Sequence, residues 1–519
     1  MHDWFDQAIR PSDPQGAAPI AGAPNVWNLL VTREQWNQAT ENIAAGGGRL
    51  ISLWASRNRD GENLVHAAFA ADSGALVLTL RSVGAESHYP GIEQSFPSAR
   101  RMQRAVADLS GLHSTDADRR PWLRHAAWPA SFHPLDDASP PDQTSPPAID
   151  DYPFVPVQGE GVHEIPVGPV HAGIIEPGHF RFSIVGEKVL RLEQRLGYVH
   201  KGIERRFSEL SLLEGHRLAA RVSGDSAVAY SWAYCQALEG MSAARVPPRA
   251  LWLRALALEL ERIANHLGDL GALGNDAGFA VGLAQFSRLK EQLLRATEHA
   301  LAQRYLMDFV VPGGTRADLS STHAAELTTC VQSIAAEVET LRAIYDEHAG
   351  MRDRFNGAGT VTPALAAKLG LIGLAGRASG QAFDLRADTP CDPYGELAPA
   401  KVVRTEGDVA ARVAVRFDEV AESIRLVGQI VQRLPDGGHR RPVSIAGEGS
   451  WGIGLIEGWR GPVLVSLEAG ADGKILRCHP HDPSWQNWPV LEHAIIDNIV
   501  PDFPLINKSF NLSYSGHDL

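Results

Sequence analysis

Two serines stand at the spacing that metal proteins use for paired cysteines. In RVSGDSAVAY, residues 221–230, Ser223 and Ser226 are three positions apart, and Tyr230 follows four positions after Ser226. Soft thiolates bind nickel, iron and zinc, whereas a neutral alcohol is a hard, poor ligand. The stretch therefore has two interpretations. It is a helix start, with Ser223 as N-cap and Asp225 near the helix dipole, or it is a metal motif without its ligands.

The cysteines of the chain are too scattered to form a metal site by themselves. They are Cys235, Cys330, Cys391 and Cys478. The absence of any CxxC pair excludes a disulfide scaffold and a self-contained iron–sulfur or cysteine-rich zinc site. The CHPH stretch places Cys478 beside His479 and His481. A strand there would point Cys478 and His479 to opposite faces, so zinc binding is disfavoured.

The composition excludes several function classes. The 519 residues are 44% hydrophobic and 21% charged, which is typical of a soluble globular protein with more than one domain. The net charge of −13 without a Lys/Arg-rich run argues against nucleic-acid binding. We find no secretory signal and no apolar run of about 20 residues. We therefore expect a cytoplasmic protein, or one that is peripheral on the cytoplasmic face of a membrane.

A segment rich in proline and aspartate divides the chain. Residues 1–25 are predicted to be a loose arm, 26–135 a small α/β domain, 136–155 a linker and 156–519 a large domain. In the small domain, RLISLWAS and ALVLTLRSV read as strands and PSARRMQRAVADLSGLH as a helix. The overall fold class is α+β.

The large domain is predicted to be a bundle of long helices with peripheral β-structure. It begins with strands in HEIPVGPV and HFRFSIVGEKVLRLEQRLG, the second sequence turning at VGEK. It closes with strands in PVLVSLEA and KILRCHP, a helix in PVLEHAIIDN and an extended tail to Leu519. Helical periodicity marks the ranges 203–219, 225–241, 247–272, 283–308, 319–348 and 408–434.

A series of motifs, in order, resembles a known family. They are VGPVHAGIIEPGHFRF, RLGYVHKGIERR, LELERIANHLGDLG, VVPGGTRADL, AGRASGQAFDLRADTPCDPYG and EGWRG. Over residues 160–519 the chain resembles the large subunit of formate hydrogenlyase-type, energy-converting [NiFe]-hydrogenases. More distantly, it resembles the quinone-site large subunit of respiratory complex I.

The small domain resembles the small peripheral subunit of complex I, which such proteins carry fused ahead of the large one. Arg104, Asp108 and Gly111 match a helix of that family, whereas Gln103 and Ala105 replace its acidic residues. HAAWPASFHPL resembles the element that closes the same domain.

The resemblance implies that a metal site has been lost. The family holds nickel and iron with two CxxC pairs, whose positions here are Ser223, Ser226, Ser513 and Gly516. Tyr230 stands where a histidine usually follows the first pair. Because no thiolate remains, we expect no [NiFe] centre, and we expect this chain to hold no cofactor itself.

Polar residues of the family's site are retained. The candidate catalytic residues are Glu176, His179, Asp225, Tyr230 and Arg460. Four of them, Glu176, His179, Asp225 and Arg460, would line with Arg221 a titratable cavity suited to proton transfer. The alternatives are a structural ion pair for Glu176 or Arg460 and a bond to a backbone carbonyl for His179. Glu457 and Gly461 complete EGWRG, where hydrogenases usually show EAPRG.

The resemblance to complex I is incomplete at the quinone site. Gly224 takes the place of the quinone-binding tyrosine, whereas His179 corresponds to the family's histidine ligand. Whether Tyr230 substitutes for the missing tyrosine stays open. His200, Lys201, Glu204 and Arg205 would lie near the iron–sulfur cluster of a partner subunit, and the cations among them would stabilise its reduced form. The alternative for them is a solvated helix face.

Three functions are consistent with these features. The first is a redox subunit of a membrane-bound complex without [NiFe], which passes electrons from a cluster-binding small subunit to a quinone or another small acceptor. Antiporter-like membrane subunits would couple this transfer to ion movement, with the chain on the cytoplasmic face of the inner membrane. The second is a non-catalytic scaffold of such a complex. The third, a working [NiFe]-hydrogenase, conflicts with the ligand set. No GxGxxG motif follows a strand, so NADH chemistry would belong to another subunit.

Overall fold

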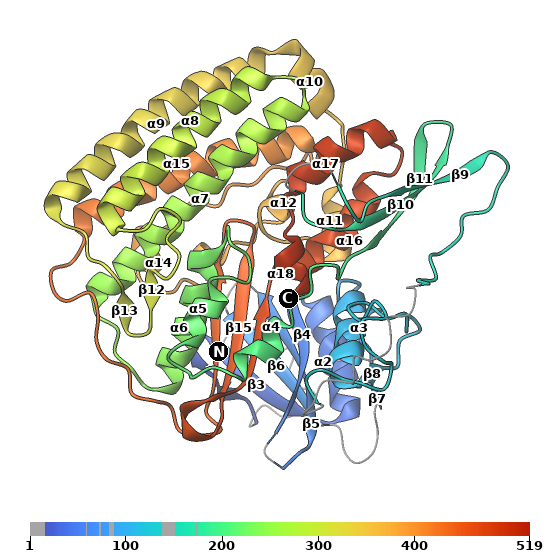
Figure 1. The fold of residues 1–519 in the computed structure, drawn as a ribbon, viewed down its shortest axis with the longest axis horizontal. Coiled ribbons are helices and arrows are strands. Elements are labelled where there is room, and N and C mark those ends of the chain that lie inside the picture. The colour runs from blue at the N-terminus through green and yellow to red at the C-terminus, as the bar shows by residue number, and fades with distance from the viewer. Residues whose placement is uncertain (1–15, 59, 72–73, 82–87, 137–150, 172–174) are drawn as a thin grey trace.

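Long helices lie on one side of the molecule and layered sheets on the other (Figure 1). A computed structural model describes residues 16–58, 60–71, 74–81, 88–136, 151–171 and 175–519. Most of the predicted linker, residues 137–150, lies outside the described residues. The mixture of a helical bundle with peripheral sheets confirms the predicted α+β class.

The small domain is built on a five-stranded sheet with the strand order β1-β3-β6-β5-β4. Its β3 and β6 are parallel, whereas the other neighbours are antiparallel. The predicted strands β4 and β6 and the predicted helix α3 are confirmed, whereas α2 and β5 were not recognised in the sequence. The elements are β1 (Ala18–Pro19), β3 (Val26–Val31), α2 (Arg33–Ala45), β4 (Arg49–Arg57), β5 (Asn63–Ala71), β6 (Gly74–Arg81), β7 (His88–Tyr89), α3 (Ala99–Ser110) and β8 (His113–Ser114).

Both faces of this sheet are buried. Along β5, Val65 and Phe69 belong to the large apolar cluster that also contains the buried apolar side chains of α2 and α3. Ala68 points the other way, into a cluster with Ile453 and Leu455 of the large domain. Side chains alternate along a strand, so one sheet can serve two cores. The small domain is therefore packed against the large one through its sheet.

A second sheet, in the order β16-β15-β14-β2, lies against the first. Its strands are β2 (Ala21–Gly22), β14 (Trp451–Glu457), β15 (Pro462–Ala469) and β16 (Ile475–His481). β1 pairs with β3, and β2 pairs in parallel with β14, so two short strands form where the sequence predicted a loose arm. Gly22 permits this contact, since a Cβ there would lie 2.1 Å from the carbonyl oxygen of Ile453. The arm was predicted from composition, which does not reveal such long-range pairing.

Four long helices form the bundle. They are α7 (Pro248–Asp276), α8 (Ala280–Leu301), α9 (Ser321–Glu347) and α15 (Val409–Arg433). α8 packs between α7 and α9, and α15 packs on both α7 and α9 (Figure 1). All four were predicted, although α8 ends at Leu301 and not at 308, because Ala302 adopts a left-handed conformation.

α6 (Ala227–Met241) joins the bundle to the sheets. It is buried nearly all round, including the side chains of Tyr230, Trp232 and Cys235, and it lies across β14 and β15. A helix that is apolar on every side belongs to a core. The shorter elements around it are β12 (Val310–Val311), β13 (Gly314–Thr315), α10 (Ala349–Phe355), α11 (Pro363–Leu369), α12 (Gly373–Arg377), α13 (Leu385–Asp388) and α14 (Tyr394–Leu397).

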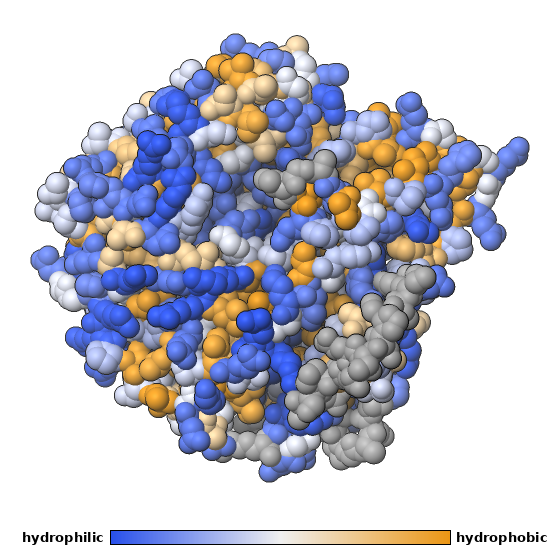
Figure 2. Space-filling view, viewed as in Figure 1, coloured by the Kyte–Doolittle hydropathy of each residue, from blue (hydrophilic) through white to orange (hydrophobic). Residues whose placement is uncertain are grey.

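A three-stranded sheet projects from the body of the molecule (Figure 1). It consists of β9 (Val162–Val167), β10 (His179–Val185) and β11 (Lys188–Arg195), as predicted with the turn at VGEK. Figure 2 shows apolar side chains gathered over this part of the surface, and Val185 and Leu190 are about two-fifths exposed. No helix in the described residues has the length and apolar composition needed to cross a membrane.

Two predictions in the large domain were wrong. The range 203–219 forms two short helices, α4 (Ile203–Phe207) and α5 (Gly215–Ala219), because the backbone between them bonds to residues 473–475. The expected extended tail is helical, with Leu505, Ile506 and Phe510 buried at helical spacing. Its elements follow α16 (Ser484–Ala494) and are a 3₁₀ turn (Val500–Asp502), α17 (Phe503–Phe510) and α18 (Tyr514–Asp518).

Candidate functional site

The two halves of the candidate metal site meet in space. Ser223 lies just before α6 and Ser513 just before α18, and their hydroxyl oxygens are 2.9 Å apart. The Ser513 hydroxyl also accepts a hydrogen bond from the Gly516 N–H at 2.8 Å and caps α18. Ser226 is buried beside them and lies within 3.3 Å of the same carboxylate that Ser223 contacts.

That carboxylate belongs to Asp225, which forms an ion pair with Arg460 between the serines. Nη1 of Arg460 donates to Oδ1 of Asp225 at 2.7 Å, and Nη2 donates to Oδ2. Such a two-point contact is the strongest arrangement of a guanidinium and a carboxylate. Burial alone would raise the pKa of Asp225, but the charge and hydrogen bonds of Arg460 hold that pKa below its ordinary value.

Several contacts fix this ion pair in place. The guanidinium of Arg460 stacks over the Trp459 ring at 4.0 Å, and its Nε donates to the Asn511 carbonyl at 2.6 Å. The indole of Trp459 donates to the Asp225 carbonyl at 2.9 Å. The EGWRG stretch is anchored in turn by Glu457, which is buried and accepts a hydrogen bond from Arg377 at 2.8 Å. Burial raises the pKa of Glu457 to about 7.

The hydrogen-bond direction across the site can be assigned. The Ser223 hydroxyl has one proton and donates it to Asp225 at 2.8 Å. The Ser513 hydroxyl must therefore be the donor in the 2.9 Å contact with Ser223. The result is a short chain from Ser513 through Ser223 to the Asp225 carboxylate.

The fourth ligand position is filled by a residue that the sequence did not suggest. A Cβ at Gly516 would lie 2.5 Å from Oδ2 of Asp482. The same Oδ2 accepts a hydrogen bond from the Tyr230 hydroxyl at 2.8 Å, and Oδ1 accepts one from the Ser484 N–H. Tyr230 thus reaches the site through Asp482. Asp482 follows β16 directly, and no motif marked it.

These side chains do not fit a nickel–iron centre. The four positions offer three hydroxyls and no side chain at Gly516, whereas soft thiolates are the ligands that bind nickel and low-spin iron strongly and bridge the two metals. A carboxylate and a guanidinium, bound to each other, lie among the hydroxyls. The arrangement is instead that of a polar site that can hold and exchange protons.

The N-terminus of α6 is capped differently from the prediction. Neither Ser223 nor Ser226 makes a capping hydrogen bond. The N–H groups of Val228 and Ala229 donate to the carboxylate of Glu261 on α7 at 2.8 and 3.4 Å. Burial raises the pKa of Glu261 to about 8, although both backbone bonds act in the opposite direction. The cap comes from a neighbouring helix, which no local sequence pattern reports.

A pocket of 140 Å³ opens beside Asp225 and Glu261. Gly224 faces it, and a Cβ on Gly224 would meet no atom within 4 Å. The pocket mixes apolar and polar side chains from α7, from α8 and from the segment after α8. They include Leu260, Asn265, Lys290, Thr297, Arg304 and Tyr305. The space that a tyrosine at 224 would enter is thus open and adjoins a titratable carboxyl group.

Two predicted site residues, Glu176 before β10 and His179 at its start, do not join the ion pair. Glu176 accepts a hydrogen bond from the Ser515 N–H of α18 at 3.2 Å. His179 donates from Nδ1 to the Gly168 carbonyl at 3.1 Å and lies beside Phe154. Its buried Nε2 has no partner among the described residues, and burial lowers the pKa of the ring. His179 therefore adopts the backbone-bonded alternative.

Arg221 also lies apart from the ion pair. It makes a two-point contact with Asp308, at 2.6 and 2.8 Å, on the surface. About half of the Arg221 side chain is exposed. Arg221 thus does not line the pocket beside Gly224 and Asp225.

Two of the predicted cluster-facing cations, His200 and Lys201, contact the C-terminal residues Asp518 and Leu519. His200 bonds through Nδ1 to the Asp518 carbonyl at 2.7 Å, and the Lys201 N–H bonds to the Leu519 carbonyl. Burial lowers the pKa of Lys201, whereas the charges of Glu176 and Asp518 act in the opposite direction. Arg205 bonds to the Pro134 carbonyl of the preceding segment. Glu204, on the same short helix, is buried against Arg477 at 2.9 Å.

The CHPH residues do not converge on a common point. His479 lies 2.8 Å from Ser52 and 2.6 Å from Glu204, and His481 lies 3.1 Å from Gln486. Cys478 is a buried free thiol whose pKa is raised by burial. These contacts support the interpretation as ordinary strand residues.

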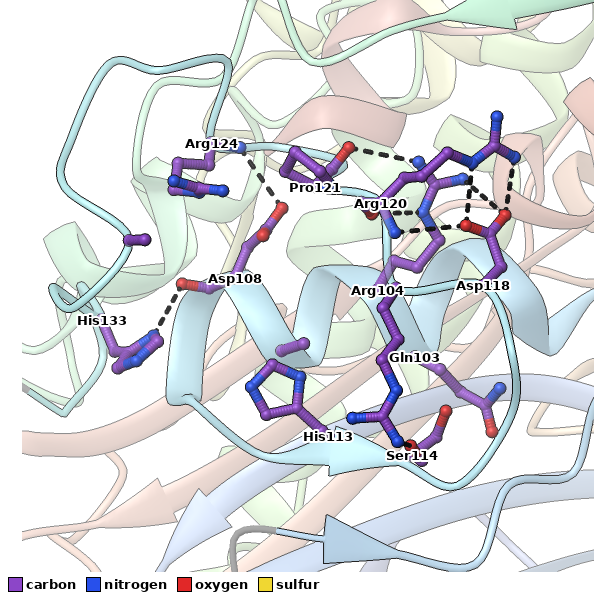
Figure 3. A pocket seen from close by; sticks show the side chains of 13 residues that line it. Gln103, Arg104, Asp108, His113, Ser114, Asp118, Arg120, Pro121, Arg124 and His133 are labelled. Atoms are coloured by element: carbon purple, nitrogen blue, oxygen red, sulfur yellow. Dashed lines mark hydrogen bonds and ion pairs between the residues drawn. The ribbon is translucent and has the colours of Figure 1, made fainter. Parts of the chain in front are cut away.

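The family-matching residues of the small domain have structural contacts. Beside a 300 Å³ pocket, Asp108 accepts hydrogen bonds from the N–H groups of residues 122–124, and Figure 3 shows the bond from Arg124. Arg104 donates to the carbonyls of Arg120 and Pro121 at 2.7 and 3.1 Å. Asp108 and Arg104 thus hold the segment 118–124 against α3.

Comparison with known proteins finds similarity over most of the chain. Residues 276–446 match the family described as the respiratory-chain NADH dehydrogenase 49 Kd subunit. The chain is 31% identical over 441 residues to formate hydrogenlyase subunit 5 of Escherichia coli strain K12, which covers 83% of this chain and 77% of that protein. It is 29% identical over 356 residues to the carbon monoxide-induced hydrogenase of Rhodospirillum rubrum, which covers 67% of this chain and 97% of that protein.

A solved structure shares the fold. It belongs to the membrane-bound sulfane sulfur reductase, an archaeal respiratory membrane complex, and matches with a TM-score of 0.65 at 22% identity. The match covers 70% of this chain and 100% of that chain.

Proposed function

Because the chain belongs to the family of large subunits that membrane-bound hydrogenases share with complex I, we propose that it is a peripheral subunit of a membrane-bound oxidoreductase complex that works without a [NiFe] centre. A neighbouring subunit with an iron–sulfur cluster supplies electrons, and the acceptor is a quinone or another small molecule. The complex couples this transfer to ion translocation through antiporter-like membrane subunits, with the chain on the cytoplasmic face.

The ion pair between Asp225 and Arg460 carries this proposal. It lies among the hydroxyls that replace the family's thiolates, with two contacts between the charged groups. Hard oxygen atoms bind protons and hydrogen-bonded substrates, whereas they are poor ligands for nickel. The site thus keeps the two chain segments that meet in the family's fold, but it offers oxygen atoms where the family offers thiolates.

The pocket next to the ion pair suits a small acceptor. It adjoins Asp225 and Glu261, and the pKa of Glu261 is raised to about 8 by burial. A carboxyl group that titrates near neutral pH can deliver the proton that a reduced quinone takes up. The pocket's apolar wall, with Leu260 and Leu294, suits a ring system.

A scaffold role is the second candidate, and the same ion pair favours it in part. Arg460 bonds to Asp225 and to the Asn511 carbonyl, so its charge is balanced in the resting state. Gly224 also lacks the side chain with which complex I binds the quinone. In this role, the chain would hold its partners together without taking part in electron transfer.

The two candidates are separated in the purified complex. Asp225→Asn removes the charge that Arg460 contacts, and Asp308→Asn removes the carboxylate of a similar ion pair on the surface. The redox role predicts at least a ten-fold loss of quinone-linked electron transfer in Asp225→Asn, while the complex still assembles with its full cluster content. Asp308→Asn is expected to keep the wild-type activity. Equal activity in both variants would support the scaffold role. Nickel at one atom per complex would contradict both.

A further inference from the structure

We propose that the facing ends of α8 and α9 form a binding site for a divalent transition-metal ion of the zinc type, with His299, His323 and Glu326 as ligands. One ligand atom from each of these residues lies within 4.8 Å of the others. Zinc is bound by imidazole nitrogen and carboxylate oxygen atoms, and two histidines with one glutamate are a known ligand set for it. None of the three ligands belongs to the ion pair of Asp225 and Arg460, and the site does not depend on the proposed electron transfer.

Helix geometry brings the three side chains together. His299 lies in the last turn of α8. His323 and Glu326 lie in the first two turns of α9 and are three positions apart, so they share one face of the helix. The N-terminus of α9 is fixed because the Ser320 hydroxyl accepts a hydrogen bond from the His323 N–H. α8 and α9 pack side by side along their length (Figure 1).

The present distances are close to those of a bound ion. Nε2 of His299 lies 3.1 Å from Oε2 of Glu326, and the His299 and His323 rings are 4.6 Å apart between centroids. Ligand atoms of a tetrahedral zinc site are about 3.4 Å apart, which follows from metal–ligand distances of about 2.1 Å. The side chains of His299 and Glu326 are 66% and 54% exposed, so they can rotate by the small amount required. A water molecule would complete the four ligands.

A metal at this position would close the base of the segment that joins the two helices. Residues 302–320 connect α8 to α9, and Arg304, Tyr305 and Leu306 of this segment line the pocket beside Asp225. Closing the ends of a connecting segment reduces the conformations available to it. Metal binding is therefore expected to restrict one wall of that pocket and to stabilise the helix pair.

Zinc titration of the full, untagged chain tests this site. We expect calorimetry with zinc chloride to give one equivalent of zinc, retained on gel filtration and measured by elemental analysis. His299→Gln and Glu326→Gln are expected to weaken binding at least ten-fold, whereas His439→Gln, another surface histidine near a carboxylate, leaves it unchanged. X-ray absorption at the zinc edge should show nitrogen and oxygen ligands at about 2.0–2.2 Å.

Two results would overturn the proposal. One is a wild-type chain that retains no zinc. The other is equal zinc binding by the wild type, His299→Gln and Glu326→Gln, which would place the ion elsewhere. All the substituted positions are at the surface, so circular dichroism is expected to show that the variants fold. Adding zinc should raise the Tm of the wild type and of His439→Gln, and should not raise the Tm of His299→Gln or Glu326→Gln.

Discussion

The hydroxyl oxygens of Ser223 and Ser513 lie 2.9 Å apart, although 290 positions separate the two residues in the chain. The Ser223 hydroxyl, just before α6, donates to the Asp225 carboxylate, and the Ser513 hydroxyl caps α18. The Trp488 indole also donates to the Ser513 carbonyl at 3.2 Å. The fold thus keeps two distant segments in the contact that a shared metal would require in the family.

This contact predicts a disulfide in a double variant. In Ser223→Cys/Ser513→Cys the two sulfur atoms start close to one another, and a disulfide needs them at about 2.05 Å with only a small shift. We expect oxidation to join the pair, observed by peptide mapping with mass spectrometry and by faster migration on a non-reducing gel. The single variants are the control for the four native cysteines, of which Cys235 and Cys478 are buried. Separate thiols under mild oxidant would contradict the contact.

Two glycines of the site should respond in opposite ways to alanine. At Gly516 the new methyl group would lie 2.5 Å from Asp482, so Gly516→Ala is expected to lower the free energy of unfolding by about 1–3 kcal/mol. At Gly224 the methyl group meets nothing within 4 Å, and the backbone φ is not in the left-handed region. Gly224→Ala should therefore be neutral or stabilising by up to about 1 kcal/mol. Urea denaturation of the two variants measures the difference, and equal destabilisation would contradict the position of Asp482.

The ion pair predicts an asymmetry between its two partners. Asp225→Asn leaves Arg460, whose side chain is 6% exposed, without the carboxylate that contacts it directly, and we expect a loss of about 3 kcal/mol. Arg460→Met leaves Asp225, whose side chain is 38% exposed, in contact with water, so the loss should be about 1–2 kcal/mol. The double variant should lose less than the sum of the two. Thermal or urea unfolding of all three variants tests this order, and strict additivity would show that the charges do not interact.

Elements with strong periodicity could be predicted from the sequence, and elements that depend on close packing could not. The bundle helices α7, α9 and α15 were found from their apolar spacing. β14 was not, since its sequence WGIGLIE is weakened as a strand by two glycines. Those glycines let α6 approach: a Cβ at Gly454 would lie 1.8 Å from the Ala233 carbonyl oxygen. β14 is stabilised by its packing against α6, and the local sequence of the strand does not indicate this contact.

The candidate site could likewise be predicted from the sequence only in part. The resemblance indicated that the segments around Ser223 and Ser513 belong together, and their convergence follows from the shared fold. It could not indicate that His179 bonds to the Gly168 carbonyl, or that Asp482 and Glu261 approach from other elements. Which donor a buried carboxylate contacts depends on tertiary packing. Asp482 stands in no recognisable motif, and the motif LELERIANHLGDLG contains Glu261 but does not indicate what its carboxylate contacts.

The carboxyl group of Glu261 predicts a dependence of stability on pH. Its pKa is raised from 4.5 to about 8, so between these values the folded chain keeps a proton that the unfolded chain releases. The protonated carboxyl group stabilises the folded chain fully below pH 4.5, and this stabilisation is lost as the pH rises toward 8. The free energy of unfolding falls over this range by at most about 1.4 kcal/mol per pH unit. Glu261→Gln cannot release a proton, yet its amide oxygen can still accept the bonds from Val228 and Ala229. We therefore expect the stability of this variant to fall less between pH 5 and pH 9 than the stability of the wild type does, as measured by urea midpoints.

The control is Glu298→Gln, which changes an exposed glutamate on α8. If Glu261→Gln declines with pH as steeply as the wild type and Glu298→Gln, the carboxyl group is already ionised at pH 5 and cannot serve as a proton donor beside the pocket.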